Sequence, residues 1–168
     1  VAFTLLEGDD AAGVTLMLLD EGMDSGPIIA QEENAILPHD TVATLTDRLF
    51  REGAELLVRS LPHYLRGDLV ARPQVEAQVT YARKLTKEDG TIQWGLPAVT
   101  LWRQVRAYAP WPGSYTRWQG KLLKVLDAVP LPGGEGSQPG AVTLLESVTP
   151  APVGVVTRDG ILGLKRVQ

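Results

Sequence analysis

Apolar residues in the first part of the chain follow the pattern of short strands separated by polar turns. Residues 1–6 and 14–19 are apolar runs, and such runs between turn residues are typical of strands. Residues 28–32 and 35–37 predict further strand. The segment 20–27, Asp-Glu-Gly-Met-Asp-Ser-Gly-Pro, contains two glycines and a proline. These residues interrupt any regular pattern and predict a loop.

The spacing of apolar positions changes to a helical period after Asp40, a residue type that caps helices. We expect Gly53 to interrupt this helix, and a second helix to follow over 54–65 with a bend at Pro62. Residues 67–80 show only weak periodicity. They are predicted to form a linker between two domains.

The back of the chain has the pattern of a helix followed by a small β domain. Residues 92–94 predict a short strand, and Pro97 at the first helical position begins a helix over 98–107. The Asp159-Gly160 pair is a hairpin signal. Five strands are expected, over 114–118, 121–129, 141–146, 153–157 and 161–167. A small barrel with one helix would close this set without exposed edges.

Charge is distributed unevenly between these two parts. Residues 1–76 contain 14 acidic and 5 basic residues, a net charge of −9, whereas residues 77–168 contain 6 acidic and 11 basic residues, a net charge of +5. This asymmetry suggests that the back part binds a polyanion. Two solvated surfaces that merely differ in charge would give the same counts, so charge alone leaves both interpretations open.

Composition excludes several classes of protein. The 168 residues include no cysteine, which excludes a disulfide framework, a thiolate metal site and a cysteine nucleophile. No apolar run approaches the roughly 18 residues of a membrane span, and the first residues lack the features of a secretory signal. The chain has no initiator Met and starts in an apolar run. We therefore expect the interior of a longer, cytoplasmic protein.

Few residues carry obvious chemistry. Glycine-rich phosphate loops and a nucleophile elbow are absent. His39 and His63 have no ligand-spaced partners, so we expect surface or capping roles and no metal site. Asp24, between Gly22 and Gly26, is the most unusual polar residue. Its carboxylate could be held by backbone amides yet stay reachable, or it could simply stabilise the turn.

Three segments together resemble one family of enzymes. Residues 8–28, which include Asp-Glu-Gly-Met-Asp-Ser-Gly-Pro-Ile, are similar to the folate loop of formyltransferases that use 10-formyltetrahydrofolate. Residues 81–94 (Tyr-Ala-Arg-Lys-Leu-Thr-Lys-Glu-Asp-Gly-Thr-Ile-Gln-Trp) and 106–116 (Arg-Ala-Tyr-Ala-Pro-Trp-Pro-Gly-Ser-Tyr-Thr) are similar to the C-terminal domain of methionyl-tRNA formyltransferases. The segments follow the family's order over essentially the whole chain. The chain departs from the family at Ala109, often Asn, and at Gln93, usually Asp.

The resemblance implies a catalytic role for Asp24. The family's catalytic set is an Asn, a His and the folate-loop Asp, and Asp24 matches that Asp by motif. It would orient the His, while Val14, Gly22 and Met23 would lie with Asp24 around the pterin of 10-formyltetrahydrofolate, without a metal. Core packing explains Val14 equally well. The Asn-x-His motif and the sheet before it are missing from this chain, so the chain alone is expected to be inactive.

The resemblance also implies a fold and a partner. Residues 1–67 would be the α/β tail of a Rossmann-like formyltransferase domain, 68–86 a linker, and 87–168 an OB-like β-barrel with a helix that binds tRNA. Lys121 and Lys124 lie on opposite faces of one strand, so not every basic residue faces the same way. The candidate phosphate contacts are Arg83, Lys84, Lys87, Arg103, Arg106, Lys121 and Lys124, with Arg117, Lys165 and Arg166 in addition.

Tryptophans could contribute to RNA binding by stacking, but most of them have a simpler explanation. Trp94, Trp102 and Trp111 are expected to pack in the core rather than stack on bases. Trp118 lies beside Arg117 on a predicted hairpin, and its role stays open.

The expected function of the parent protein is transfer of a formyl group from 10-formyltetrahydrofolate to methionyl-initiator-tRNA, by a monomeric enzyme of translation initiation. A nucleotide-sugar N-formyltransferase is an alternative, because it shares the folate loop and a similar Pro-Trp-Pro-Gly segment. The basic back part favours the polyanionic acceptor. A stand-alone RNA-binding module is a further alternative, because the catalytic Asn and His are missing from the chain.

Overall fold

The described chain forms two compact units. The structure, a computed structural model, describes residues 1–145 and 150–168. The first unit combines three pieces of chain, Val1–Gly8, His39–Ala43 and Lys84–Gln168. The second unit consists of Asp9–Pro38 and Thr44–Arg83. In the described residues, no helix combines the length and the apolar composition that a membrane span requires.

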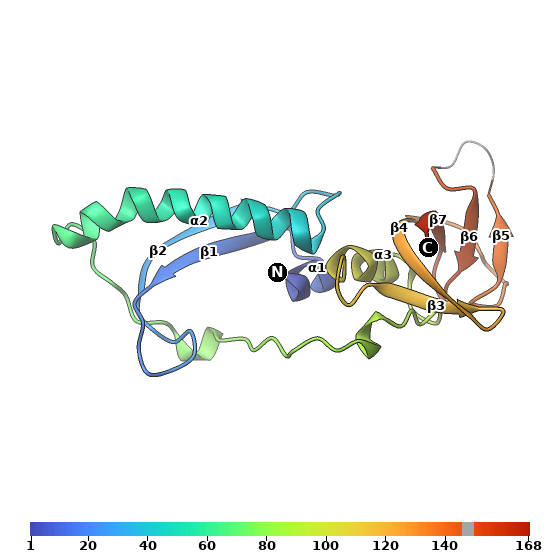
Figure 1. Cartoon of the computed structure of the whole chain (residues 1–168), viewed down its shortest axis with the longest axis horizontal. Helices are drawn as coiled ribbons and strands as arrows, with labels where there is room; N and C mark the ends of the chain where they lie inside the picture. The colour runs from blue at the N-terminus through green and yellow to red at the C-terminus, as the bar shows by residue number, and fades with distance from the viewer. Residues whose placement is uncertain (146–149) are drawn as a thin grey trace. The chain divides into compact units, whose positions relative to one another are not determined.

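The second unit is a β-hairpin accompanied by a long helix (Figure 1). Strands β1 (Ala11–Met17) and β2 (Ile28–Ala35) pair in antiparallel register. The two short strands expected over 28–32 and 35–37 are therefore one strand. Two arginines of helix α2 (Val42–Leu65) donate hydrogen bonds to residues of β2. Arg48 donates to the carbonyl of Ala35 at 2.9 Å, and Arg59 pairs with Glu32 at 2.5 Å.

Helix α2 is continuous, so the expected interruption at Gly53 is wrong. A glycine inside a helix costs about 1 kcal/mol relative to alanine, but tertiary packing supplies most helical stability. Leu45, Leu49 and Leu56 are buried on one face of α2, which offsets that cost. Pro62 lies within the last turn, where few helical bonds remain to be lost. A short 3-10 helix, η1 (Glu76–Gln78), follows in the same unit.

The first residues form a helix, so the strand expected over residues 1–6 is also wrong. Helix α1 (Ala2–Glu7) ends at Gly8, which has a φ of 77° and donates its N–H to the carbonyl of Thr4 at 3.1 Å. Glycine in the left-handed region is a common helix terminator. A short apolar run does not distinguish strand from helix by itself, and Gly8 was the signal that could have decided it.

The first unit contains a second helix and a five-stranded antiparallel sheet. After η2 (Glu88–Gly90), α3 (Ala98–Ala107) begins directly after Pro97, which is its N-cap. The strand expected over 92–94 is absent from the described structure; Thr91 instead makes an isolated bridge to Tyr115. The strands are β3 (Ser114–Trp118), β4 (Lys121–Leu131), β5 (Val142–Leu144), β6 (Val153–Val156) and β7 (Ile161–Val167), in the order β3-β4-β7-β6-β5.

These five strands agree closely with the sequence prediction. Residue 146, the expected end of one strand, lies outside the described residues. Among the described residues, β3 and β5 are the two end strands of this sheet, and β3 has only the isolated bridge to Thr91 on its outer side. Trp111, expected in the core, is 59% exposed. It stands in the turn between α3 and β3, where the Gly113 N–H bonds back to the carbonyl of Tyr108 at 2.8 Å.

The core of the first unit lies between α3 and one face of the sheet. Leu101 and Val105 of α3 pack with Val125 of β4 and Leu162 of β7. Trp94 and Trp102 pack against this cluster and are partly buried. Burying a leucine contributes about 1.5–3 kcal/mol, so this contact holds the helix on the sheet.

Replacing Leu162 tests this core. Leu162 is 0% exposed, and we expect Leu162→Ala to lower the free energy of unfolding by about 2–5 kcal/mol because it leaves a cavity. Leu122→Ala makes the same deletion on the same sheet at a side chain that is 51% exposed, and should change stability by no more than about 0.5 kcal/mol. Urea unfolding followed by circular dichroism measures both. Equal losses would contradict the assigned core.

Candidate functional site

The connection between β1 and β2 carries Asp24 on an exposed loop. Asp24 has a φ of 57°, in the left-handed region that few residues other than glycine adopt, although aspartate tolerates it better than most. Among the described residues, no group donates a hydrogen bond to the Asp24 carboxylate. The side chain is exposed to solvent, so the loop presents a carboxylate outward.

Asp20 and Gly26 fix the shape of this loop from within. One carboxylate oxygen of Asp20, Oδ1, accepts hydrogen bonds from the Gly22 N–H at 3.0 Å and from Ser25 Oγ at 2.9 Å. At the base of the loop, the Leu18 N–H donates to the carbonyl of Pro27 at 2.9 Å. Gly26 is buried, and a Cβ there would lie 1.7 Å from the carbonyl oxygen of Leu18. No larger residue fits at that position.

Gln74 clamps the same loop from a distant part of the chain. Its side-chain amide donates to the carbonyl oxygens of Asp24 and Gly26, both at 2.8 Å. Nearby, Arg72 and Ile28 exchange backbone hydrogen bonds of 2.8 and 2.7 Å. The segment after α2 is thus attached to the loop that carries Asp24. A cleft of about 480 Å³ runs beside this attachment and includes Gln74 in its lining.

Sequence reasoning missed both loop-holding residues. Asp20 had a local signal, because an aspartate two residues before a glycine commonly accepts a bond from that backbone N–H. Gln74 had none, because it lies 50 residues from Asp24 along the chain. Only the fold brings the two together.

The structure distributes the expected folate-binding residues over two places. Gly22, Met23 and Asp24 stand together in the exposed loop, and the Met23 side chain is 81% exposed. Val14 lies on β1 and faces α2, since a Cβ on Gly53 would approach the Val14 side chain at 3.8 Å. The packing explanation of Val14 therefore has direct support, and its role toward a ligand stays a prediction.

Two of the expected phosphate contacts are engaged inside the first unit. Arg103 donates to the carbonyl of Glu7, at the end of α1, at 3.1 Å. Arg106 donates through Nε to the carbonyl of Asp40 at 2.7 Å and lies over the ring of Trp102, with its guanidinium carbon 4.3 Å from the ring centroid. Burial lowers the pKa of Arg106, and the charge of Asp40 opposes this effect. Both arginines join α3 to other pieces of chain.

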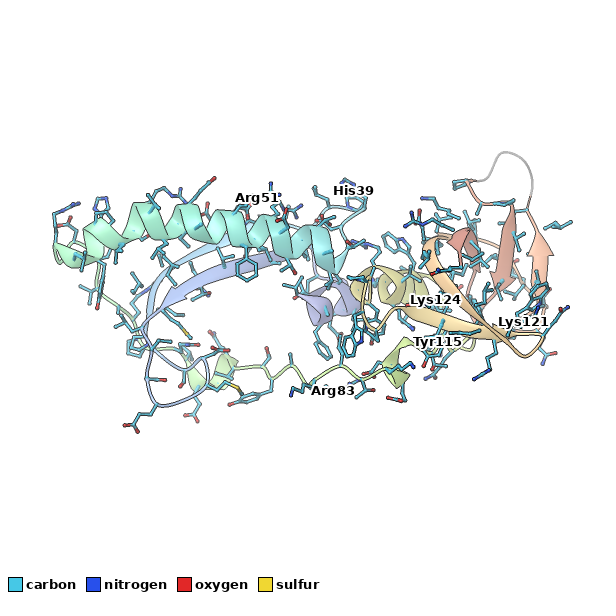
Figure 2. The ribbon with its side chains drawn as sticks, viewed as in Figure 1. His39, Arg51, Arg83, Tyr115, Lys121 and Lys124 are labelled. Atoms are coloured by element: carbon cyan, nitrogen blue, oxygen red, sulfur yellow. The ribbon has the colours of Figure 1, made fainter. Side chains whose placement is uncertain are left out.

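The remaining basic candidates lie on exposed backbone or strand positions. Arg83 and Lys84 are on the extended segment after η1, as Figure 2 shows for Arg83, and Lys87 precedes η2. Lys121 stands at the tip of the β3–β4 hairpin opposite Trp118, and Lys124 stands opposite Tyr115 (Figure 2). The two lysines are three residues apart and so face opposite sides of β4. Arg117, Lys165 and Arg166 are exposed on β3 and β7.

Neither histidine takes part in a cluster of possible metal ligands. His63 lies near Asp68 at the end of α2, with Nδ1 3.3 Å from a carboxylate oxygen, and His39 is exposed. Within residues 1–145 and 150–168, no group of three or more His, Asp or Glu side chains could hold a metal ion.

Comparison with known proteins identifies two family models along the chain. The model described as "Formyl transferase" matches residues 1–61, and the model described as "Formyl transferase, C-terminal domain" matches residues 84–168. The second model alone covers just over half of the chain. The two matches occur in the order that the sequence segments indicated.

Similar proteins include methionyl-tRNA formyltransferases and a protein solved with tetrahydrofolic acid. The chain is 48% identical over 142 residues to a methionyl-tRNA formyltransferase of Chloroflexus aggregans, covering 84% of this chain and 46% of that protein. It is 41% identical over 168 residues to one from Roseiflexus, covering 100% of this chain and 51% of that protein. A crystal structure of HypX from Aquifex aeolicus in complex with tetrahydrofolic acid matches with a TM-score of 0.71 at 25% identity, over 99% of this chain and 28% of HypX.

The chain spans about half the length of the curated relatives it matches. Within that span, two consecutive family models, the identity to relatives and the shared fold all agree. The chain belongs to the formyl transferase family.

Proposed function

We propose that the chain is the rear part of a methionyl-tRNA formyltransferase. The observation that carries this proposal is 41% identity over the whole chain to a protein of that name. We assign residues 1–67 to the end of the catalytic domain, 68–86 to a linker and 87–168 to an OB-like C-terminal domain. The matched family models, over 1–61 and 84–168, support this division.

The proposed reaction moves a formyl group between two nitrogens. The amino group of methionine on initiator tRNA forms a bond to the formyl carbon and loses a proton, while the bond from that carbon to folate N10 breaks and N10 takes up a proton. An oxyanion develops during such acyl transfer and must be stabilised. Asp24 would act by orienting and charging a histidine supplied by the part of the enzyme that this chain does not contain, because a carboxylate favours the imidazolium form.

The loop around Asp24 supports this role. Its backbone is held by Asp20 and Gln74, while its carboxylate projects into solvent. Residues held in sparsely populated backbone conformations often occur at functional sites. Gly22 and Met23 belong to the same loop and would contact the folate. Val14, on β1, would be a further contact. HypX, whose structure is similar to this chain, was solved in complex with tetrahydrofolic acid. This similarity is consistent with a folate co-substrate.

The C-terminal part would bind tRNA. Its five antiparallel strands with one helix are consistent with an OB-like barrel, a fold that commonly binds oligonucleotides. Exposed lysines at the β3–β4 hairpin could contact phosphates. We expect the full-length enzyme to be a cytoplasmic monomer.

Two alternatives make different predictions. A nucleotide-sugar N-formyltransferase would share the loop of Asp24 but would not need RNA affinity. A stand-alone RNA-binding module would bind RNA but would not depend on Asp24. Identity of 48% to a methionyl-tRNA formyltransferase favours the first proposal over both.

Replacing Asp24 tests the catalytic role. In a protein of the relatives' full length that contains this chain, we expect Asp24→Asn to lower kcat about 100-fold or more, because the amide cannot favour the charged form of the partner histidine. The Kd for tRNA should stay unchanged. Glu21→Gln removes the same charge from the same exposed loop and should leave kcat nearly intact. Near-normal turnover of Asp24→Asn would refute the assignment.

Replacing Gln74 tests how the loop is held. Gln74→Ala removes two hydrogen bonds, each worth about 1 kcal/mol, so the amide of Leu18 at the loop base should exchange with solvent about tenfold faster or more. Hydrogen exchange followed by NMR on the 168-residue chain measures this rate. Gln78→Ala, at an exposed position four residues on, is the control. Unchanged exchange in Gln74→Ala would show that the base of the loop is held without Gln74.

Salt dependence tests the proposed tRNA contacts. We expect the Kd for an initiator tRNA transcript to rise steeply with salt because lysines displace counterions from phosphates. Lys121→Ala should reduce the slope of log Kd against log salt by about 1, and Lys124→Ala, on the opposite face of β4, should reduce it less. Arg51→Ala removes a charge that is paired with Asp47 in the second unit and should leave the slope unchanged. Salt-independent binding would overturn the proposed electrostatic interface.

A further inference from the structure

An apolar groove opens on the five-stranded sheet of the first unit. Its volume is about 460 Å³, within the range of small-molecule sites. The floor continues the core face of the sheet, through Val125 and Leu164. Soluble domains seldom leave such a concave apolar surface without a partner. Most of the lining is apolar, from Trp94, Trp118, Leu123, Val125, Val142, Pro152, Val153, Val155, Leu164 and Val167.

Two tryptophans contribute to the walls of this groove in different ways. Trp94 is partly buried, and its Nε1 donates to Thr116 Oγ1 at 3.3 Å, which fixes the orientation of the ring. Trp118 is the last residue of β3 and is 57% exposed. An exposed indole at a groove edge offers a flat surface for a second planar group.

The hairpin turn holds Trp118 in place. Gln119 and Gly120 have φ values of 50° and 79°, the conformation of a tight two-residue turn that fixes the strand register. Lys121 is therefore directly opposite Trp118 on the same face of the sheet. The Trp118 side chain, which lines the groove, therefore has a lysine as its cross-strand neighbour, and Figure 2 labels this Lys121 at the end of the hairpin.

The charge of the groove selects among possible occupants. Three of its lining residues, Arg117, Lys165 and Arg166, are basic, and none of the described lining residues is acidic. Lys165 also pairs with Asp127 at 2.9 Å. A purely apolar partner would gain nothing from this basic edge. A flat apolar group attached to an anion would match both the floor and the edge.

We infer that the groove binds one unpaired nucleotide of an RNA partner, with the base against Trp118 and the phosphate toward Lys121 and Arg166. The RNA partner itself rests on the proposed function. Unpaired bases are recognised by stacking on aromatic side chains, and each such base contributes enough that alanine substitution weakens binding about tenfold. A paired base within a helix could not enter the groove.

Three RNA probes of equal length separate this inference from general electrostatic binding. They are a fluorescein-labelled single-stranded oligouridine, the same backbone without bases, and an RNA duplex, each titrated with the 168-residue chain at fixed salt. We expect oligouridine to bind tighter than the abasic strand. Trp118→Ala should weaken oligouridine binding about tenfold and leave the abasic strand and the duplex unchanged, whereas Trp118→Phe should retain most of the affinity.

Trp111→Ala provides the matched control, because Trp111 is 59% exposed but is not a lining residue of the groove. It should bind all three probes like the unchanged chain. Equal losses in Trp111→Ala and Trp118→Ala, or equal affinity for oligouridine and the abasic strand, would overturn the groove assignment while leaving salt-dependent tRNA binding intact. Absence of binding to every RNA, including tRNA, would overturn both the groove and the proposed RNA partner.

Discussion

Helix α3 is the element on which the first unit depends. Its apolar face places Leu101 in the core with Leu162 of β7, and both side chains are fully buried. Its first N–H group, from Ala98, donates to the carbonyl of Asp159 in the β6–β7 turn at 2.9 Å. On other sides, the helix holds the end of α1 and the segment before α2. Three pieces of chain far apart in sequence therefore form one unit because each contacts the same ten-residue helix.

Because of this arrangement, some of the basic residues in the back of the chain make contacts inside the first unit. Arg103 and Arg106 use their guanidinium groups to bind backbone carbonyls of Glu7 and Asp40. Both arginines are partly buried, and each of these hydrogen bonds, made by a charged donor, contributes to stability. Two of the 11 basic residues in residues 77–168 therefore stabilise the unit. The exposed lysines of the β3–β4 hairpin are better placed for an external polyanion.

The sequence predicted the β part well because its signals are local. The turn residues Gln119-Gly120 and Asp159-Gly160 fix hairpin positions directly, and alternating apolar residues fix which side is buried. The strand predicted over residues 1–6 is a helix in the structure, because a run of six residues is too short to show a period. The predicted interruption at Gly53 does not occur, because the cost of a glycine in a helix is local, whereas the burial of leucines that offsets it depends on the fold.

In the candidate site, too, one feature can be predicted from local sequence and another depends on a residue far along the chain. Asp24 could be found from its motif, but the side-chain amide of Gln74, which helps to hold the backbone of its loop, is indicated by no local pattern. That amide fixes the backbone on both sides of Ser25 through the carbonyls of Asp24 and Gly26. The carboxylate remains exposed and accepts no hydrogen bond from the described residues. A residue with a fixed backbone and an unengaged side chain is preorganised for a partner that arrives from elsewhere, because little entropy remains to be lost when the contact forms.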